Sequence, residues 1–254
     1  MIETITPSVL DLTRPALWPA ELLDALDEHK ALFAAWERGD GSISGQAYDR
    51  AIYSVTSALQ PYVVKGWHCT RLTEHEISHI LAEGLQLPDE TMLQSRIDRL
   101  VIQGVLTDEI AAQLKAKNQS ADWNRAGRLW FVGYQPGLAG RSGIGRFFRH
   151  WGGEALYNYH EGNPDTSLVL QRIGIPCIVE AAFPVPSLRP HGLALHIQKV
   201  FWAHTSGYSI EGFQFEDCAV EPLPASAIER IHRFPEPEFI RLADCAAWFE
   251  PVRL

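Results

Sequence analysis

Apolar residues in the first third of the chain recur at helical spacing. Residues 20–37 carry leucine and phenylalanine about one turn apart, and this period predicts a helix. A second amphipathic segment covers residues 46–59 and stops before Pro61. The continuous apolar run that follows, YVVKGWHCT at residues 62–70, predicts a strand.

The next helix carries signals at both of its ends. Thr73 followed three residues later by Glu76 is a capping box, and Gly84 supplies a C-terminal stop. These residues predict a helix over 74–83. Residues 89–117 then show two further helical periods, separated by a glycine.

The second half of the chain is rich in β-like runs. Strands are predicted at residues 127–134, 176–185, 195–204 and 213–221. A helix-like segment, residues 144–159, separates the first two. Helices first and strands later predict an α+β fold with a mostly antiparallel sheet. We expect residues 1–61 to form a helical region packed on a core of residues 62–254, with a helical insertion at 89–117.

Composition narrows the class of protein without identifying it. The chain has 254 residues, of which 46% are hydrophobic and 21% charged, as in an ordinary soluble globular protein. A net charge of −9 disfavours non-specific attraction to nucleic acid or anionic lipid, although it leaves room for a local basic groove. The four cysteines form no C-x-x-C pair, and neither a leader nor a membrane-length apolar run stands out. A cytoplasmic location without a membrane partner is therefore expected.

The sequence HEISH offers one candidate chemistry. Two histidines one helical turn apart, His75 and His79, can share a zinc ion while Glu76 activates its water. Two features oppose this interpretation. Glu76 already belongs to the capping box, and both histidines are expected opposite the apolar face of the helix, toward water. A zinc-dependent hydrolase remains an alternative, and no metal site is preferred.

A second candidate is His68, at the end of the predicted strand 62–70. The strand reads His68-Cys69-Thr70-Arg71 and is followed by a helix and a Gly-Leu pair. This order resembles the first motif of the ADP-ribosyltransferase superfamily, in which the histidine holds the ribose of NAD. The resemblance implies that Cys69, Thr70 and Arg71 also lie beside the bound NAD.

The strand GRLWFVGY, residues 127–134, resembles the second motif of that family, an aromatic strand. The family stacks the aromatic side chain on nicotinamide, and Trp130 stands at or near its position, with Phe131 and Tyr134 as alternatives. Ser142 precedes the next helical segment, as a serine does in the family. Three arginines around that segment are candidates for the NAD diphosphate, with a solvated surface as the alternative: Arg141, Arg146 and Arg149.

Strand 213–221 resembles the third motif, Gln/Glu-x-Glu. Alternation along a strand directs Gln214 and Glu216 to the same side. In the family the second residue contacts the nicotinamide ribose and the first orients the acceptor. Glu211 and Glu221 are competing carboxylates, and an exposed edge-strand glutamate is the structural alternative.

Together the motifs imply a split antiparallel ADP-ribosyltransferase-like core with N-terminal and inserted helices. The implied activity is transfer of ADP-ribose from the substrate NAD to a macromolecular acceptor, protein or nucleic acid. Bacterial members of this size are often toxins or defence effectors, which implies an inhibitory partner protein. The same residues also fit a non-catalytic relative that binds a nucleotide or partner, or an RNA 2′-phosphotransferase. The decisive spatial prediction is that residues 68, 130 and 216 meet in one cleft.

Overall fold

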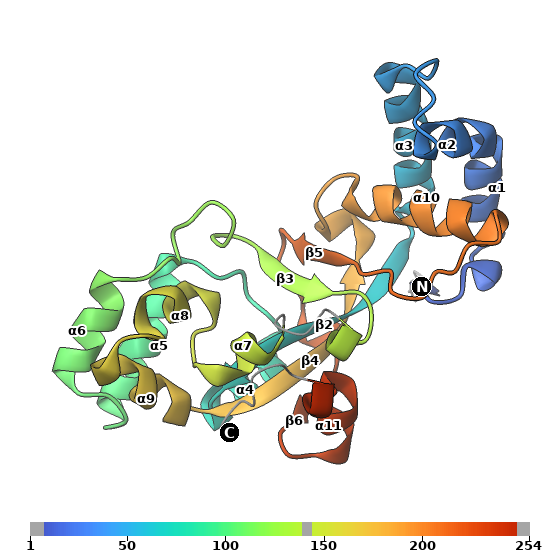
Figure 1. Cartoon of the computed structure of the whole chain (residues 1–254). Coiled ribbons are helices and arrows are strands. Elements are labelled where there is room, and N and C mark those ends of the chain that lie inside the picture. The colour runs from blue at the N-terminus through green and yellow to red at the C-terminus, as the bar shows by residue number, and fades with distance from the viewer. Residues whose placement is uncertain (1–7, 139–143, 248–254) are drawn as a thin grey trace, which may run out of the picture.

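The computed structural model describes residues 8–138 and 144–247, which form one antiparallel sheet flanked by helices (Figure 1). The strands are β1 (Ser8–Leu10), β2 (Tyr62–Leu72), β3 (Leu129–Val132), β4 (Ile175–Pro184), β5 (Glu216–Ala219) and β6 (Ile228–Arg233). Their order is β5-β3-β2-β4-β6, and β1 pairs with β2 in the sheet's one parallel pairing. The expected antiparallel sheet with N-terminal and inserted helices is confirmed.

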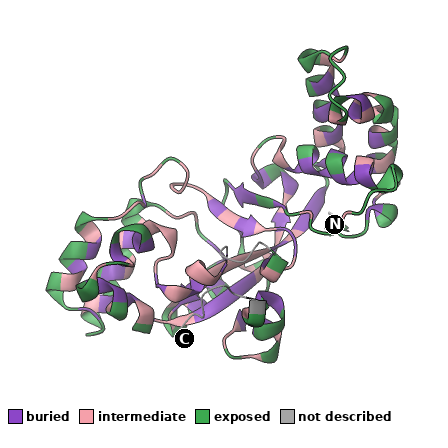
Figure 2. Cartoon of the chain, in the orientation of Figure 1, coloured by how far each residue is buried: buried purple, intermediate pink, exposed green. Residues whose placement is uncertain are grey.

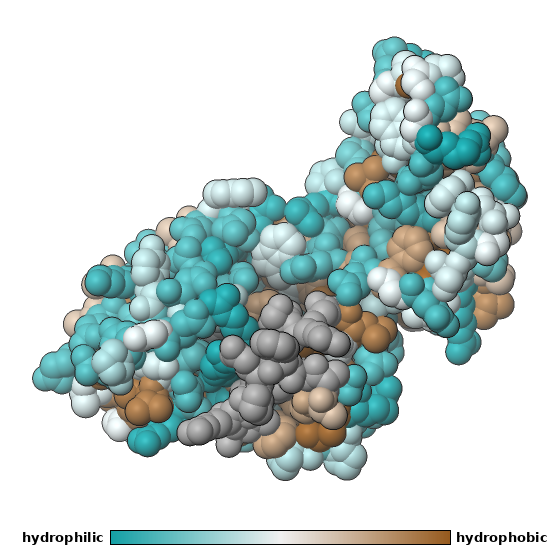
Figure 3. Space-filling model, viewed as in Figure 1, coloured by the Kyte–Doolittle hydropathy of each residue, from teal (hydrophilic) through white to brown (hydrophobic). Residues whose placement is uncertain are grey.

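Eleven α-helices lie in the described residues. They are α1 (Ala20–Glu28), α2 (Lys30–Glu37), α3 (Gly45–Leu59), α4 (Glu74–Glu83), α5 (Glu90–Ile102), α6 (Asp108–Ala116), α7 (Gly145–Arg149), α8 (Glu154–His160), α9 (Pro164–Arg172), α10 (Gly192–Thr205) and α11 (Pro237–Ala243). None of them is long and apolar enough to cross a membrane. The face in Figure 3 is mostly hydrophilic, with apolar side chains gathered in separate small areas.

The sheet divides at the junction of β2 and β3. β2 pairs with β4 along all but its first residue, from Val63 opposite Pro184 to Leu72 opposite Ile175. Its pairing with β3 is confined to Trp67 opposite Val132. On one side of this contact the two strands therefore diverge, and β3 pairs fully with β5 instead.

The N-terminal helices α1–α3 stand together with α10 at one end of the sheet (Figures 1 and 2). α3 packs against α1, α2 and α10, so α10 extends this helical layer from the far end of the chain. Phe33 and Val55 belong to the same buried cluster as Val64 of β2 and Phe183 of β4. The N-terminal helices therefore belong to the same continuous core as the sheet, and β1 joins the sheet directly.

The inserted helices α5 and α6 form a second, smaller core with the segment 151–173. Ile97 and Leu114 pack there against Trp151 and Leu170, and all four side chains are buried. Gly104, with φ of +69°, turns the chain between the two helices. In Figure 1 these helices lie together with α8 and α9 at the opposite end of the sheet from α1–α3.

Several predicted elements are wrong. Residues 195–204 are not a strand but part of α10, where Leu193, Ile197 and Val200 follow a helical period. Because this helix is buried on more than one side, its polar face is too narrow to show the period clearly. The predicted helix 20–37 is two helices that meet at His29.

The predicted helix 144–159 is divided into α7 and α8. Gly152 and Gly153 separate them with φ of +85° and +55°, a backbone conformation outside the helical region that glycine adopts readily. β5 is shorter than predicted, since the chain from 213 to 215 does not join the ladder. The sequence patterns do not predict β1, α9, β6 or α11.

Candidate functional site

A cavity of about 500 Å³ lies beside the point where β2 and β3 diverge. Its wall is built from residues 67–70 of β2, one face each of α4 and α5, the segment from 125 to 132, and parts of the α7–α8 region. His68, Trp130 and Glu216 all line it, from strands β2, β3 and β5. The fold therefore brings three distant candidate residues to one wall.

His68 bridges the gap between the diverging strands. Its Nδ1 lies 2.8 Å from the carbonyl oxygen of Trp130, and since a carbonyl can only accept, Nδ1 carries the proton. Burial lowers the pKa of His68 below its ordinary value, and nearby Arg96 acts in the same direction. The ring is therefore neutral at physiological pH, with Nε2 as a hydrogen-bond acceptor.

Trp130 is fixed by contacts at its edge and its face. Its Nε1 donates to the carbonyl oxygen of Asn124 at 2.7 Å, and the Arg189 guanidinium lies 4.7 Å from the ring centroid. Asp217, which is fully buried, accepts a hydrogen bond from Arg189 Nε at 2.6 Å. These contacts hold the indole in one orientation on the cavity wall.

Glu216 is the first residue of β5 and lies opposite Val132 of β3. Its side chain is exposed at the cavity wall. Partial burial against that wall raises the pKa of Glu216, the charge of Glu154 adds to the effect, and Arg189 opposes it. A carboxylate with a raised pKa beside a cavity is typical of functional sites, and purely structural ion-pair networks also shift pKa values.

Some of the remaining candidate residues also line the cavity. Cys69 and Thr70 do so from β2, and burial raises the pKa of the Cys69 thiol, which keeps it protonated and unreactive. Phe131 touches the cavity, but its ring stacks on Phe183 in the core at 3.9 Å between centroids. Phe131 is therefore a weaker candidate than Trp130 for the aromatic platform at this wall.

Two candidate residues lie outside the cavity wall. Tyr134 is buried in the core, and its hydroxyl lies 2.8 Å from Nε2 of His196. Gln214 is exposed just before the start of β5 and donates from Nε2 to the carbonyl oxygen of Leu138 at 2.5 Å. Gln214 and Glu216 share only a small hollow of about 50 Å³. Ser142 lies outside the described residues.

Arg71, a candidate for contact with NAD, lies outside the cavity wall. Its side chain is 4% exposed and does not line the cavity. The guanidinium donates to four backbone carbonyls at 2.8–3.1 Å, those of Phe148, Gln171, Ile173 and Gly174. Burial lowers the pKa of Arg71 to about 10, so it remains charged at neutral pH and holds these segments together.

The diphosphate candidates around α7 do not form a basic patch on the cavity. Arg146 is held by Glu161, to which its Nε donates at 3.1 Å, and lies over the ring of Tyr157. Arg149 does not line the cavity either. Arg141 lies outside the described residues.

The HEISH segment lacks the geometry of a zinc site. His75 and His79 are exposed on α4, where both line the cavity, and their ring centroids are 6.3 Å apart. Glu76 closes the capping box with Thr73 as predicted and also accepts from Arg96 Nε at 2.6 Å. Although burial opposes its ionisation, the Arg96 charge and these hydrogen bonds lower the pKa of Glu76. In the described part of the chain no three His, Cys, Asp or Glu side chains are grouped to hold a metal.

Sequence reasoning missed the arginines of the cavity. Arg96 and Arg99 come from α5, and Arg125 and Arg128 come from the loop before β3. The spacing of Met92, Arg96, Arg99 and Gln103 could have indicated them, because it places these residues on one face of α5. The minimal core of the ADP-ribosyltransferase family has no counterpart of α5, so the resemblance assigns no function to this face of the helix.

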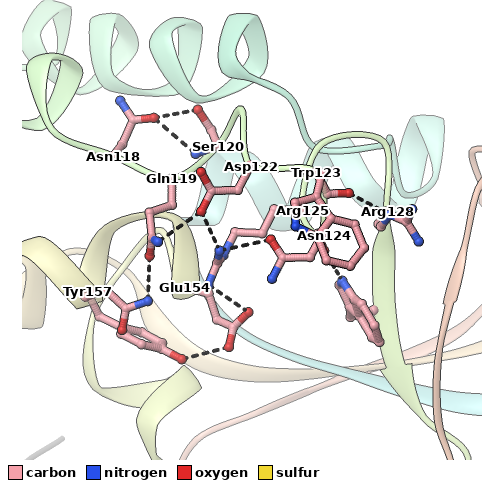
Figure 4. A network of polar contacts seen from close by, with 12 residues as sticks. Asn118, Gln119, Ser120, Asp122, Trp123, Asn124, Arg125, Arg128, Glu154 and Tyr157 are labelled. Atoms are coloured by element: carbon pink, nitrogen blue, oxygen red, sulfur yellow. Dashed lines mark hydrogen bonds and ion pairs between the residues drawn. The ribbon is translucent and has the colours of Figure 1, made fainter.

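The loop 118–128, which supplies two of these arginines, is held by a network of side chains (Figure 4). Asp122 accepts from Gln119 at 2.9 Å and from Arg125 at 3.0 Å. Arg125 also pairs with Glu154 of α8 at 3.6 Å. The loop is thereby tied to the α8 side of the cavity.

A scan against protein-family models found no match, and searches of curated proteins and of solved structures found none either. The site combines a neutral imidazole, a fixed indole, a carboxylate and several arginines around one cavity.

Proposed function

We propose that the protein is an NAD-dependent ADP-ribosyltransferase whose cavity receives NAD as substrate. The observation that carries this proposal is the meeting of His68, Trp130 and Glu216 on one cavity wall. Each of the three supplies a group that the chemistry needs, and each comes from a different strand. The acceptor is proposed to be a macromolecule that approaches the Glu216 side.

The reaction breaks the bond between the nicotinamide nitrogen and C1′ of the ribose. The electron pair leaves with nicotinamide, and positive charge develops on the ribose ring in an oxocarbenium-like transition state. Glu216 is placed to stabilise this charge as a carboxylate, as carboxylates do in glycosidases. An acceptor oxygen or nitrogen then bonds to C1′ and releases its proton to water.

His68 and Trp130 would position the sugar and its leaving group. With Nδ1–H bonded to the carbonyl oxygen of Trp130, His68 offers Nε2 to a ribose hydroxyl. The indole of Trp130, held by Asn124 and Arg189, offers a flat apolar face for nicotinamide. Held in this way, both groups would be positioned before NAD arrives, which favours catalysis by orientation.

The proposal is tested by incubating the purified protein with labelled NAD and a cell extract. Wild-type protein should transfer label to a macromolecule, and Glu216→Gln should reduce transfer by about a hundredfold or more. Glu221→Gln, an exposed carboxylate that does not line the cavity, is the matched control and should transfer normally. Equal labelling by Glu216→Gln and wild type would refute the assignment of this carboxylate. Binding of NAD without any transfer would instead favour a non-catalytic relative.

A further inference from the structure

We propose that Trp123, Arg128 and Arg99 form a nucleotide-binding subsite at the rim of the cavity, with a base on the indole and phosphate on the guanidinium groups. Trp123 is 80% exposed, although it sits in the hydrogen-bonded loop 118–128 (Figure 4). Binding at this subsite needs only an exposed indole and unpaired guanidinium groups, so it does not depend on the transfer chemistry.

Trp123 is presented to solvent on a fixed support. Its carbonyl oxygen accepts from Arg128 Nε at 2.9 Å, and the Arg128 guanidinium lies 5.6 Å from the indole centroid. The next turn of the loop is anchored by Gly127, whose N–H donates to the carbonyl oxygen of Pro88 at 2.8 Å. With the exposure given above, most of the indole surface is in contact with water and can receive a base by stacking.

The charges of the cavity identify the second half of the ligand. Arg96 is paired with Glu76 and Arg125 with Glu154. Arg99 and Arg128 also line the cavity, yet neither forms an ion pair within the described part of the chain. Two uncompensated guanidinium groups in a chain of net charge −9 form a local site for an anion.

Phosphate is the anion that fits these groups. A guanidinium binds phosphate oxygens through two parallel N–H donors, which a lysine cannot do. An aromatic face next to arginines is the combination that binds a base together with its phosphate. Arg128 connects the two parts, since it contacts both Trp123 and the cavity.

Binding of ADP and adenosine, measured by calorimetry, separates the base contact from the phosphate contact. Trp123→Ala should lower the affinity for both ligands by about fivefold or more, whereas Trp123→Phe should retain most of the affinity. Arg99→Gln should lower the affinity for ADP by about fivefold or more and leave the affinity for adenosine unchanged. Arg128→Lys should bind ADP better than Arg128→Gln. Arg172→Gln, an exposed arginine away from the cavity, should bind both ligands as wild type does.

The subsite is overturned if ADP does not bind below millimolar concentration, if Trp123→Ala binds ADP normally, or if Arg99→Gln weakens adenosine as much as ADP. Competition with NAD then identifies the source of the nucleotide. Displacement of ADP by NAD supports an adenylate half of NAD on Trp123, and simultaneous binding supports a nucleotide of the acceptor. Normal ADP binding without NAD cleavage would leave the subsite standing and remove the proposed transferase activity.

Discussion

Replacement of Arg71 by methionine should unfold the protein more easily without removing a ligand contact. The substitution keeps an unbranched side chain of similar length but deletes all of the donors that reach four backbone carbonyls. Two of these bonds, to Phe148 and Ile173, are buried, and the remaining two are partly buried. The bonds join β2 to the end of α7 and to the turn before β4.

The magnitude follows from the two buried carbonyls. The loss of the Arg71 donor at each of these carbonyls costs up to about 1–3 kcal/mol. The variant no longer buries a charged guanidinium, and this recovered hydration offsets part of the loss. A net fall of about 2–4 kcal/mol in the free energy of unfolding is expected.

Urea unfolding followed by tryptophan fluorescence measures this difference. The midpoint for Arg71→Met should fall while the slope stays unchanged, because the same surface is exposed on unfolding. Arg172→Met is the matched control, since Arg172 is exposed on α9, and it should lie within about 0.5 kcal/mol of wild type. A normal midpoint for Arg71→Met combined with weakened NAD binding would refute the structural role assigned to Arg71.

Four further predictions concern the cavity and the helices that border it. Because the pKa of Glu216 is raised, its contribution to stability is present at low pH and is lost as the pH rises through that pKa. In thermal melts at pH 7, Glu216→Gln should therefore be at least as stable as wild type. A clear loss of stability would contradict this. Wild-type transfer should in turn decline as the pH falls through the same pKa. Gly84→Ala should lower the free energy of unfolding by more than about 2 kcal/mol, since the new Cβ would lie 1.9 Å from the Leu223 carbonyl oxygen. Gly104 also has a positive φ, but the space around it is open, so Gly104→Ala should lower the free energy of unfolding by only about 1 kcal/mol in the same urea assay. Treatment with a metal chelator should leave transfer unchanged, and loss of transfer would restore the zinc-site alternative.

Elements with signals inside their own sequence were predictable. α4 begins and ends where Thr73, Glu76 and Gly84 placed it, because caps act on neighbouring backbone groups. The two inserted helices were also predicted, since one side of each faces water. α10 was mistaken for a strand because most of its surface is buried, in part against α2 and α3, and that contact is not encoded within residues 192–205.

The sequence predicted the candidate site residues only where it also predicted the strand that carries them. His68, Trp130 and Glu216 stand on β-strands whose pairing carries them to one wall. Arg71 lies on β2 three residues after His68, but the carbonyls that bury its guanidinium come from residues about a hundred positions away. Arg99 belongs to a helix without any motif, so only the folded cavity shows what it faces.

Calorimetric titration of NAD into the Glu216→Gln variant tests the central claim most directly, because this variant should bind NAD without consuming it. The account predicts one NAD per chain and a dissociation constant that rises about tenfold when His68→Ala is added. Adding His204→Ala instead, an exposed histidine at the end of α10, should change nothing. No binding at millimolar NAD, or an affinity that is the same with and without His68, would contradict a shared cleft for the dinucleotide.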